Sequence, residues 1–302
     1  MPTREATRSV SIGLGGVTRR TVGRPSWSYN SGVISPGVVT LGARWPNVLG
    51  IVDPPAFYIP AYSGHPDVGL TNPSALTLYT GSNPVPAGTY TDKEFSGSYQ
   101  LTDSSTFNNC WFHGSPWYAV LLNGSKQYFN DCEFGKVGQD CSRLIGLSGG
   151  TFEAIRCNFH DAEDGAKLGS NTVMRMCHVH DLYTSVPGAH YDSIQAEQGL
   201  STILIEYCHL SSITRTGGLG NSAFFIMADF GDQSGVTGHN NYLNGGNYTL
   251  YLNNTASYNV TGSIITDNIF GPDYRYGLRS VHSGTVATWS GNVDHLGNPV
   301  PQ

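Results

Sequence analysis

The sequence predicts an all-β protein folded as a right-handed parallel β-helix of about eight coils, with an extended N-terminal arm and a cap. Three observations lead to this prediction: glycine makes up 38 of the 302 residues, only 13% of the residues are charged, and a short motif recurs along residues 110–292. A helical bundle needs Ala, Glu, Lys and Leu at high density. The 39% apolar and 11% aromatic content is nevertheless enough for a folded core.

The recurring motif sets the period of the predicted coils. It reads NCWFHG, DCEFGK, RCNFHD, MCHVHD and YCHLSS around Cys110, Cys132, Cys157, Cys177 and Cys208, and HNNYLNG, DNIFG and GNVDH at Asn241, Asn268 and Asn292. Seven steps span 182 residues, a mean period of 26, with single steps of 20 to 33. Self-similarity at a period of 20–50 residues is typical of a repeat architecture.

Each period contains short β segments separated by turns. Within the motif the residues alternate, so Cys157 and Phe159 point to one side and Asn158 and His160 to the other. A second apolar run follows, and Gly, Asn and Ser residues then mark a turn. Two or three short strands in about 26 residues form one coil of a parallel β-helix. Each strand then pairs with its equivalent one coil later, about 4.8 Å away.

The motif position itself predicts a buried ladder. Five of the six cysteines occupy it, and Cys141 alone stands apart. Cysteine among Phe, Val and Leu on a buried face is more often a packing residue than a disulfide partner, so we favour free thiols, although stacking does not exclude disulfides. Asn241 and Asn268 continue the same position and are expected to form amide stacks.

The ends of the chain differ from the repeats. Residues 1–52 hold six arginines and one glutamate, a charge of +5, which leaves −11 of the net −6 for residues 53–302. We interpret 1–52 as an extended basic arm, 53–100 as a Pro/Gly-rich transition and N-terminal cap, and 101–302 as the β-helix. The arm lacks the aromatic-basic pattern of nucleic-acid binding, which favours docking on an acidic protein surface. No apolar run is long enough for a membrane span, and no signal peptide is recognisable.

Three segments resemble a known group of proteins. Residues 64–92 (GHPDVGLTNPSALTLYTGSNPVPAGTYTD), 164–182 (DGAKLGSNTVMRMCHVHDL) and 187–195 (PGAHYDSIQ) resemble right-handed, pectate-lyase-like β-helix proteins of actinobacterial phages, commonly minor tail proteins. A His-x-Asp-Gly-Ile-Gln motif of that group reads His-Tyr-Asp-Ser-Ile-Gln over residues 190–195, with Ser193 replacing Gly. The resemblance covers about half of the chain, roughly residues 60–210, and is weak for activity. It implies a place in the virion tail, facing the host envelope.

The most polar part of the repeats lies in the third to fifth coils. His160-Asp161 and His180-Asp181 occupy equivalent places and should stack about 5 Å apart, with His178 and His209 stacked beside them. Aligning Leu168 with Ala196 pairs Lys167 with Gln195 and places Asp164 beside Asp192. The residues expected to contact a glycan are His160, Asp161, His178, His180, Asp181, His190, Gln195 and Glu197, with Trp111, Tyr183 and Tyr191 as flat aromatic faces.

Four readings of this cluster stay open. Asp164 and Asp192 form a glycosidase pair, or they bind Ca²⁺ in a lyase with Lys167 or Arg143 as base. In a third interpretation, the residues expected to contact a glycan form only a binding surface. In the fourth, the acids simply cap turn N–H groups at coil corners. His178 and His180 resemble half of a zinc site, but no partner spacing completes it, so no metal site is expected.

These observations favour a minor tail protein whose β-helix recognises host envelope glycan, with residues 1–52 bound to other tail proteins. The alternative is a carbohydrate-active enzyme, a glycoside hydrolase or polysaccharide lyase, acting on the same envelope polysaccharide. We expect no nucleic-acid partner, no membrane insertion and no required cofactor. A homotrimer is an open alternative that no heptad pattern supports.

Overall fold

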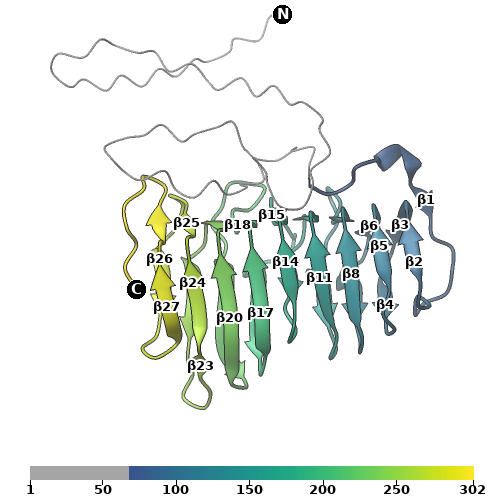
Figure 1. Ribbon diagram of the computed structural model, residues 1–302. Coiled ribbons are helices and arrows are strands. Elements are labelled where there is room, and N and C mark those ends of the chain that lie inside the picture. Colours follow the sequence, from purple (N-terminus) through teal and green to yellow (C-terminus); the bar gives the residue numbers. More distant parts are fainter. Residues whose placement is uncertain (1–67) are drawn as a thin grey trace, which may run out of the picture. The chain divides into compact units, whose positions relative to one another are not determined.

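The computed structural model describes residues 68–302, which form a right-handed parallel β-helix (Figure 1). Three long sheets, here called sheets A, B and C, run the length of this body, and the chain passes through them in that order in each coil. Every strand-to-strand pairing within the sheets is parallel, between equivalent strands of successive coils. The fold class expected from the repeat is therefore confirmed.

The strands of all three sheets are short. Sheet A contains β1 (Thr77–Leu78), β3 (Lys93–Ser96), β6 (Trp111–His113), β9 (Glu133–Phe134), β12 (Asn158–His160), β15 (His178–His180), β18 (His209–Ser211), β21 (Tyr242–Asn244), β25 (Ile269–Phe270) and β28 (Val293–Asp294). Sheet B contains β4 (Tyr99–Leu101), β7 (Tyr118–Leu122), β10 (Arg143–Leu147), β13 (Asp164–Lys167), β16 (Asp192–Gln198), β19 (Ser222–Phe230), β22 (Tyr248–Asn253) and β26 (Gly277–Val281).

Sheet C faces the viewer in Figure 1. It contains β2 (Thr89–Thr91), β5 (Thr106–Asn108), β8 (Lys126–Asn130), β11 (Thr151–Ile155), β14 (Val173–Arg175), β17 (Ser201–Glu206), β20 (Gln233–His239), β24 (Ser263–Thr266) and β27 (Val286–Ser290), with β23 (Val260–Thr261) paired to β20. One short 3-10 helix, η1 (Pro73–Ala75), precedes the first strand.

The first coil begins earlier than the sequence predicted. Strands β1, β2 and β3 lie before residue 101 and already pair within sheets A and C. Asp92 adopts the same left-handed backbone as Asn109, which places Lys93 opposite Cys110. The segment expected to be only transition and cap therefore contains a coil, hidden because Lys93 replaces the recurring cysteine. The expected arm, 1–52, and residues 53–67 lie outside the described residues.

A left-handed corner leads from sheet C into sheet A in every coil. The residue before each motif position has a positive φ: Asn109, Asp131, Arg156, Met176, Tyr207, Asn240, Asp267 and Gly291. This conformation costs a non-glycine residue about 1–2 kcal/mol. Because the same corner recurs, the side chain that follows it turns into the core each time, and equivalent side chains stack.

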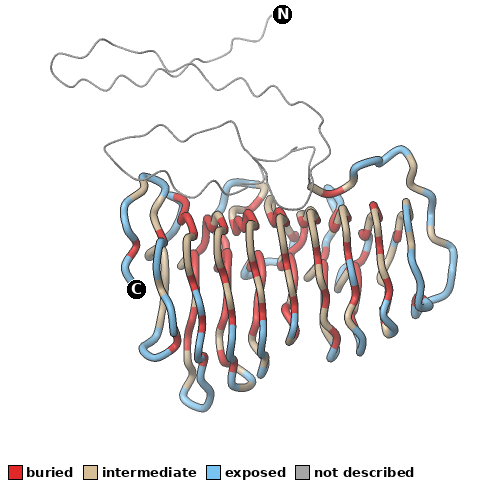
Figure 2. Tube along the Cα trace, viewed as in Figure 1, coloured by how far each residue is buried: buried red, intermediate tan, exposed pale blue. Residues whose placement is uncertain are grey.

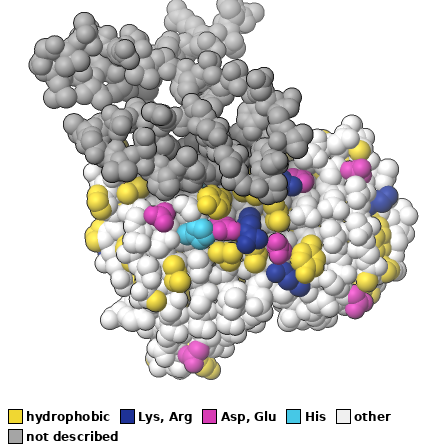
Figure 3. Space-filling model, viewed as in Figure 1, with side chains coloured by type: hydrophobic (Ala, Val, Ile, Leu, Met, Phe, Trp, Pro, Cys, Tyr) yellow, Lys and Arg dark blue, Asp and Glu magenta, His cyan; other side chains and the backbone are white. Residues whose placement is uncertain are grey.

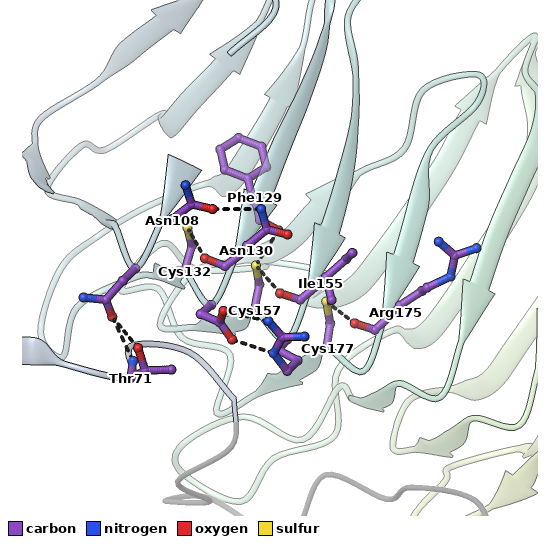
Figure 4. A network of polar contacts seen from close by, with 12 residues as sticks. Thr71, Asn108, Phe129, Asn130, Cys132, Ile155, Cys157, Arg175 and Cys177 are labelled. Carbon is purple, nitrogen blue, oxygen red and sulfur yellow. Dashed lines mark hydrogen bonds and ion pairs between the residues drawn. The ribbon is translucent and has the colours of Figure 1, made fainter. Parts of the chain in front are cut away.

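The cysteine and asparagine ladder follows from these corners. All six cysteines are buried and unbonded to one another, which agrees with the free thiols that we favoured. Cys132, Cys157 and Cys177 each donate a weak hydrogen bond to the carbonyl two residues earlier, at 3.3, 3.5 and 3.4 Å (Figure 4). Asn241 Nδ2 donates to Asn268 Oδ1 at 3.0 Å, so the expected amide stack is confirmed.

The remaining core is rich in aromatic residues at the N-terminal end and mostly aliphatic beyond it, and buried residues line the inside of every coil (Figure 2). Phe95, Phe112, Phe134 and Phe159 form one column from sheet A, with ring centroids 4.6, 5.1 and 4.6 Å apart. The column continues in register as Val179, Leu210, Leu243 and Phe270. A core this regular fixes the register of the outer faces, where the candidate sites lie.

Candidate functional site

The residues selected from the sequence fall on two separate faces of the β-helix. His160, His178 and His180 lie on sheet A. Asp164, Lys167, Asp192, Gln195 and Glu197 lie on sheet B, one corner further along each coil. We therefore describe a sheet A cluster and a sheet B cluster instead of one continuous polar wall.

The sheet A cluster is a stack of histidines, as expected. The ring centroids of His160 and His180 are 5.5 Å apart, and His178 lies 4.1 Å from His180 and 4.6 Å from His209. His160 is held on both nitrogens, by Glu133 Oε1 at 2.6 Å and Asp161 Oδ2 at 2.5 Å. These short contacts fix the His160 ring and occupy both of its nitrogens.

Asp161 and Asp181 have a structural role at the next corner. Both have positive φ, 62° and 46°, where the chain leaves sheet A. Asp161 is buried and forms an ion pair with Arg215, whose guanidinium lies 5.1 Å from the Tyr183 ring. The hydrogen bond from His180 lowers the pKa of Asp181, against a smaller desolvation effect. The geometry thus gives these two acids intramolecular partners.

A pocket that the sequence did not reveal lies beside the sheet A cluster. It has a volume of about 420 Å³ and is lined by Val68, Leu70, Pro73, Leu76, Trp111, Glu133, Asn158 and His178. Gly69 N donates to Arg156 O at 2.8 Å and holds the apolar segment beside sheet A. Glu133 precedes Asn158 and His178 in one column, so the repeat alignment could have identified it.

The sheet B cluster is built on two buried carboxyl groups. Lys167 pairs with Gln195, which confirms the expected register and sets Asp164 beside Asp192. Asp192 N donates to Asp164 Oδ1 at 3.1 Å, and Asn221 Nδ2 donates to Asp192 Oδ1 at 2.9 Å. Asp164 therefore caps a backbone N–H, as the turn-capping reading expected.

Burial controls the protonation of this pair. Asp164 and Asp192 are only 5% and 1% exposed. Desolvation raises the pKa of Asp164, although Lys167 opposes the shift. Desolvation and the neighbouring Asp164 charge raise the pKa of Asp192 well above its ordinary value. Two adjacent buried carboxyls cannot both ionise easily, so Asp192 is the member that keeps its proton to higher pH.

A small pocket lies on the same sheet as the pair, although neither Asp164 nor Asp192 lines it. It has a volume of about 160 Å³ and is lined by Arg143, Leu147, Lys167, Leu168, Gln195, Glu197 and Gln198. Lys167 Nζ lies 3.4 Å from Asp164 Oδ2 and 3.1 Å from Glu197 Oε2. Gln195 Nε2 also donates to Glu197 Oε1. Strands β10, β13 and β16 therefore place two cations, two amides and a carboxylate around one opening.

Two residues that line this pocket carry buried polar atoms without a hydrogen-bond partner. They are Arg143, through Nε, and Gln195, through Oε1. A buried polar atom in a folded protein is nearly always hydrogen-bonded, and an exception points to a missing ligand or solvent molecule. The sheet B cluster therefore offers both donors and acceptors that the chain itself leaves unused.

His190 and Tyr191 belong to neither cluster. His190 N donates to Glu163 Oε1 at 3.1 Å, and Tyr191 Oη donates to Thr184 O at 3.1 Å. These contacts order the loop between β15 and β16. His190 thus lies near the sheet B pocket in sequence without lining it.

The outer face of sheet C carries a row of charges that the sequence analysis missed. Basic, acidic and histidine side chains alternate across the face shown in Figure 3. Lys126 Nζ lies 3.3 Å from Glu153 Oε2. Arg175 bridges Glu153 and Glu206, and His239 Nε2 lies 2.6 Å from Glu206 Oε2. Each charged side chain in the row has a neighbour of opposite charge on the next strand, so we infer that these side chains help to hold the strands of sheet C together and do not form a binding site.

The donor set does not favour a metal. Ca²⁺ takes six to eight oxygen ligands, whereas Asp164 and Asp192 supply two carboxyls, with the Lys167 ammonium 3.4 Å from Asp164 Oδ2. Within residues 68–302 no three His, Cys, Asp or Glu side chains are arranged to hold a metal ion. The residues present therefore do not fit the Ca²⁺ suggested for this pair.

Comparisons with known proteins give no relative. No family model matches the chain, nor does any curated protein or solved structure. In the part of the chain that the structure describes, no helix has the length and apolarity needed to cross a membrane.

Proposed function

We propose that this protein binds glycan through the sheet B pocket of its β-helix. The observation that carries the proposal is a pair of buried, unpartnered atoms on residues that line the opening, the donor Arg143 Nε and the acceptor Gln195 Oε1. Sugar hydroxyls both donate and accept hydrogen bonds, so one ligand class satisfies both kinds of atom. Strands on a rigid solenoid hold these groups in fixed positions, which reduces the entropy lost on binding.

The virion tail is the proposed location, and host envelope polysaccharide the proposed ligand. The support is the resemblance of residues 64–92, 164–182 and 187–195 to β-helix proteins of actinobacterial phages, together with the β-helix fold itself. In this proposal residues 1–52 attach the body to other tail proteins. Deleting them should leave a folded β-helix that no longer enters particles. Normal incorporation of the truncated protein would contradict the tether.

An enzyme acting on the same glycan is the second candidate. The raised pKa of Asp192 favours it, because a protonated carboxyl is the form that a general acid requires. Burial opposes it: with 1% exposure, Asp192 is almost out of reach of a bound sugar. Lys167, the other catalytic candidate, is engaged by two carboxylates. Binding is therefore the better supported function.

Binding to purified actinobacterial envelope polysaccharides tests the proposal. We expect the wild-type protein to bind, and a Gln195→Ala/Glu197→Ala double variant to lose at least tenfold in affinity. The matched control is Lys126→Ala/Glu153→Ala, which removes an ion pair from sheet C. Equal affinity in the pocket variant and the wild type would remove this site. Release of reducing ends or unsaturated products, abolished by Asp164→Asn/Asp192→Asn, would favour the enzyme.

A further inference from the structure

The sheet B pocket contains a guanidinium that lacks the kind of acceptor found for the other arginines. Four of the other five arginines of residues 68–302 bind a carboxylate, an amide oxygen or a backbone carbonyl: Arg156 with Asp131, Arg175 with Glu153 and Glu206, Arg275 with Asn247, and Arg279 with Pro301. The fifth, Arg215, has a buried Nη2 without a hydrogen bond but lies in contact with the Asp161 carboxylate. Arg143 has only a 3.5 Å contact from Nη2 to Ser142 Oγ, and its Nε is buried without a partner.

The neighbouring strand explains why Arg143 is left without a carboxylate. Arg143 lies opposite Asp164 in the register of β10 and β13. The Asp164 carboxyl is however used by Lys167 Nζ at 3.4 Å and by the backbone N–H of Asp192 at 3.1 Å. A buried guanidinium nitrogen without an acceptor is costly, because Arg keeps its charge at all ordinary pH values.

We infer that the sheet B pocket binds an anionic glycan and that Arg143 receives the acidic group, a carboxylate or a phosphate ester. The inference rests on the proposed function and names the ligand class of the same site. A guanidinium presents parallel N–H donors that match both kinds of oxyanion. The Gln195 amide oxygen and the Glu197 carboxylate, which line the same pocket, accept from hydroxyls of the same sugar.

The size of the pocket fits this assignment. Its volume of about 160 Å³ is enough for several water molecules. One acidic group with its neighbouring hydroxyls can replace that water, whereas a longer segment must continue across the outer face of sheet B. The half-buried carboxylate of Glu197 opposes a second negative charge, so the pocket should accept one acidic group next to neutral hydroxyls.

The test compares three small probes by ¹H–¹⁵N NMR titration of the full-length chain. Methyl glucuronide carries a carboxylate, glucose 1-phosphate carries a phosphate ester, and methyl glucoside is the neutral reference. We expect at least one acidic probe to bind at least tenfold more tightly than the glucoside, which equals about 1.4 kcal/mol. We also expect it to shift the Arg143 Nε–H signal. The two acidic arms identify which oxyanion the pocket prefers.

Variants separate the local effect of Arg143 from net charge. Arg143→Gln should remove the preference for acidic probes and retain glucoside binding, and Arg143→Lys should keep only part of it. Arg156→Gln removes an equal charge from the Asp131 ion pair and should retain the full preference. Equal affinity for acidic and neutral probes, or equal losses in Arg143→Gln and Arg156→Gln, would overturn the inference and leave glycan binding intact. No response of β16 amides to any probe would overturn both.

Discussion

Replacing Asn268 by alanine should destabilise the β-helix through its amide ladder. Asn268 Oδ1 accepts from both the backbone N and Nδ2 of Asn241 at 3.0 Å. Asn268 Nδ2 donates to Gly238 O at 2.9 Å and to Asn292 Oδ1 at 2.9 Å. Each buried group left without a partner costs about 1–3 kcal/mol. The Asn241 backbone N–H has no other acceptor, so we expect a loss of about 3 kcal/mol in the free energy of unfolding.

Urea unfolding followed by circular dichroism measures this loss, with Asn268→Cys as the matched control. Cysteine is the residue that five other coils use at the same position, where its thiol donates to the carbonyl two residues earlier. Asn268→Cys should therefore cost about half as much as Asn268→Ala. A loss below about 1 kcal/mol for Asn268→Ala, or equal losses for the two variants, would refute the reasoning.

Three further predictions concern the core and the corners. The pKa of Asp192 is raised in the folded protein. The protonated Asp192 carboxyl therefore contributes fully to stability below about pH 3.8, the ordinary pKa of an aspartate, and this contribution is lost as the pH rises through the folded pKa. Asp192→Asn should therefore remove this decline and melt higher than wild type at neutral pH; a parallel pH profile for both proteins would contradict this. Gly135→Ala places a Cβ 1.8 Å from His160 O and should prevent normal folding. Gly138 also has a positive φ but no neighbour within 4 Å of an added Cβ, so Gly138→Ala should lower the free energy of unfolding by only about 1–3 kcal/mol. Similar losses of stability in the two variants would refute the steric argument. Ellman's reagent should find no fast-reacting thiol in the folded chain and six in denaturant; fewer than six would indicate disulfides.

The repeat pattern was sufficient to predict the core and part of the site. The strict alternation around Cys157 placed Cys157 and Phe159 inward and His160 outward, since side chains of a strand alternate. The same alignment gave the pairing of Lys167 with Gln195. Both predictions need only the coil period, because equivalent residues of successive coils must stack in a parallel β-helix.

Features that do not follow from the coil period could not be predicted from the sequence. The first coil was hidden because Lys93 stands where later coils have cysteine. The sheet A pocket requires Gly69 to bond Arg156, 87 residues away, and no periodicity predicts such a contact. Arg143 lacks a carboxylate partner because Asp164 pairs with Lys167 instead, and the sequence does not show which of the two cations Asp164 contacts.

A crystal structure with a bound envelope oligosaccharide would test the central claim most directly. We expect a sugar over strands β10, β13 and β16, with hydrogen bonds to Gln195 Oε1 and Glu197 and with its acidic group on Arg143. A sugar bound only in the sheet A pocket beside Trp111 and Glu133, or on the charged face of sheet C, would contradict it.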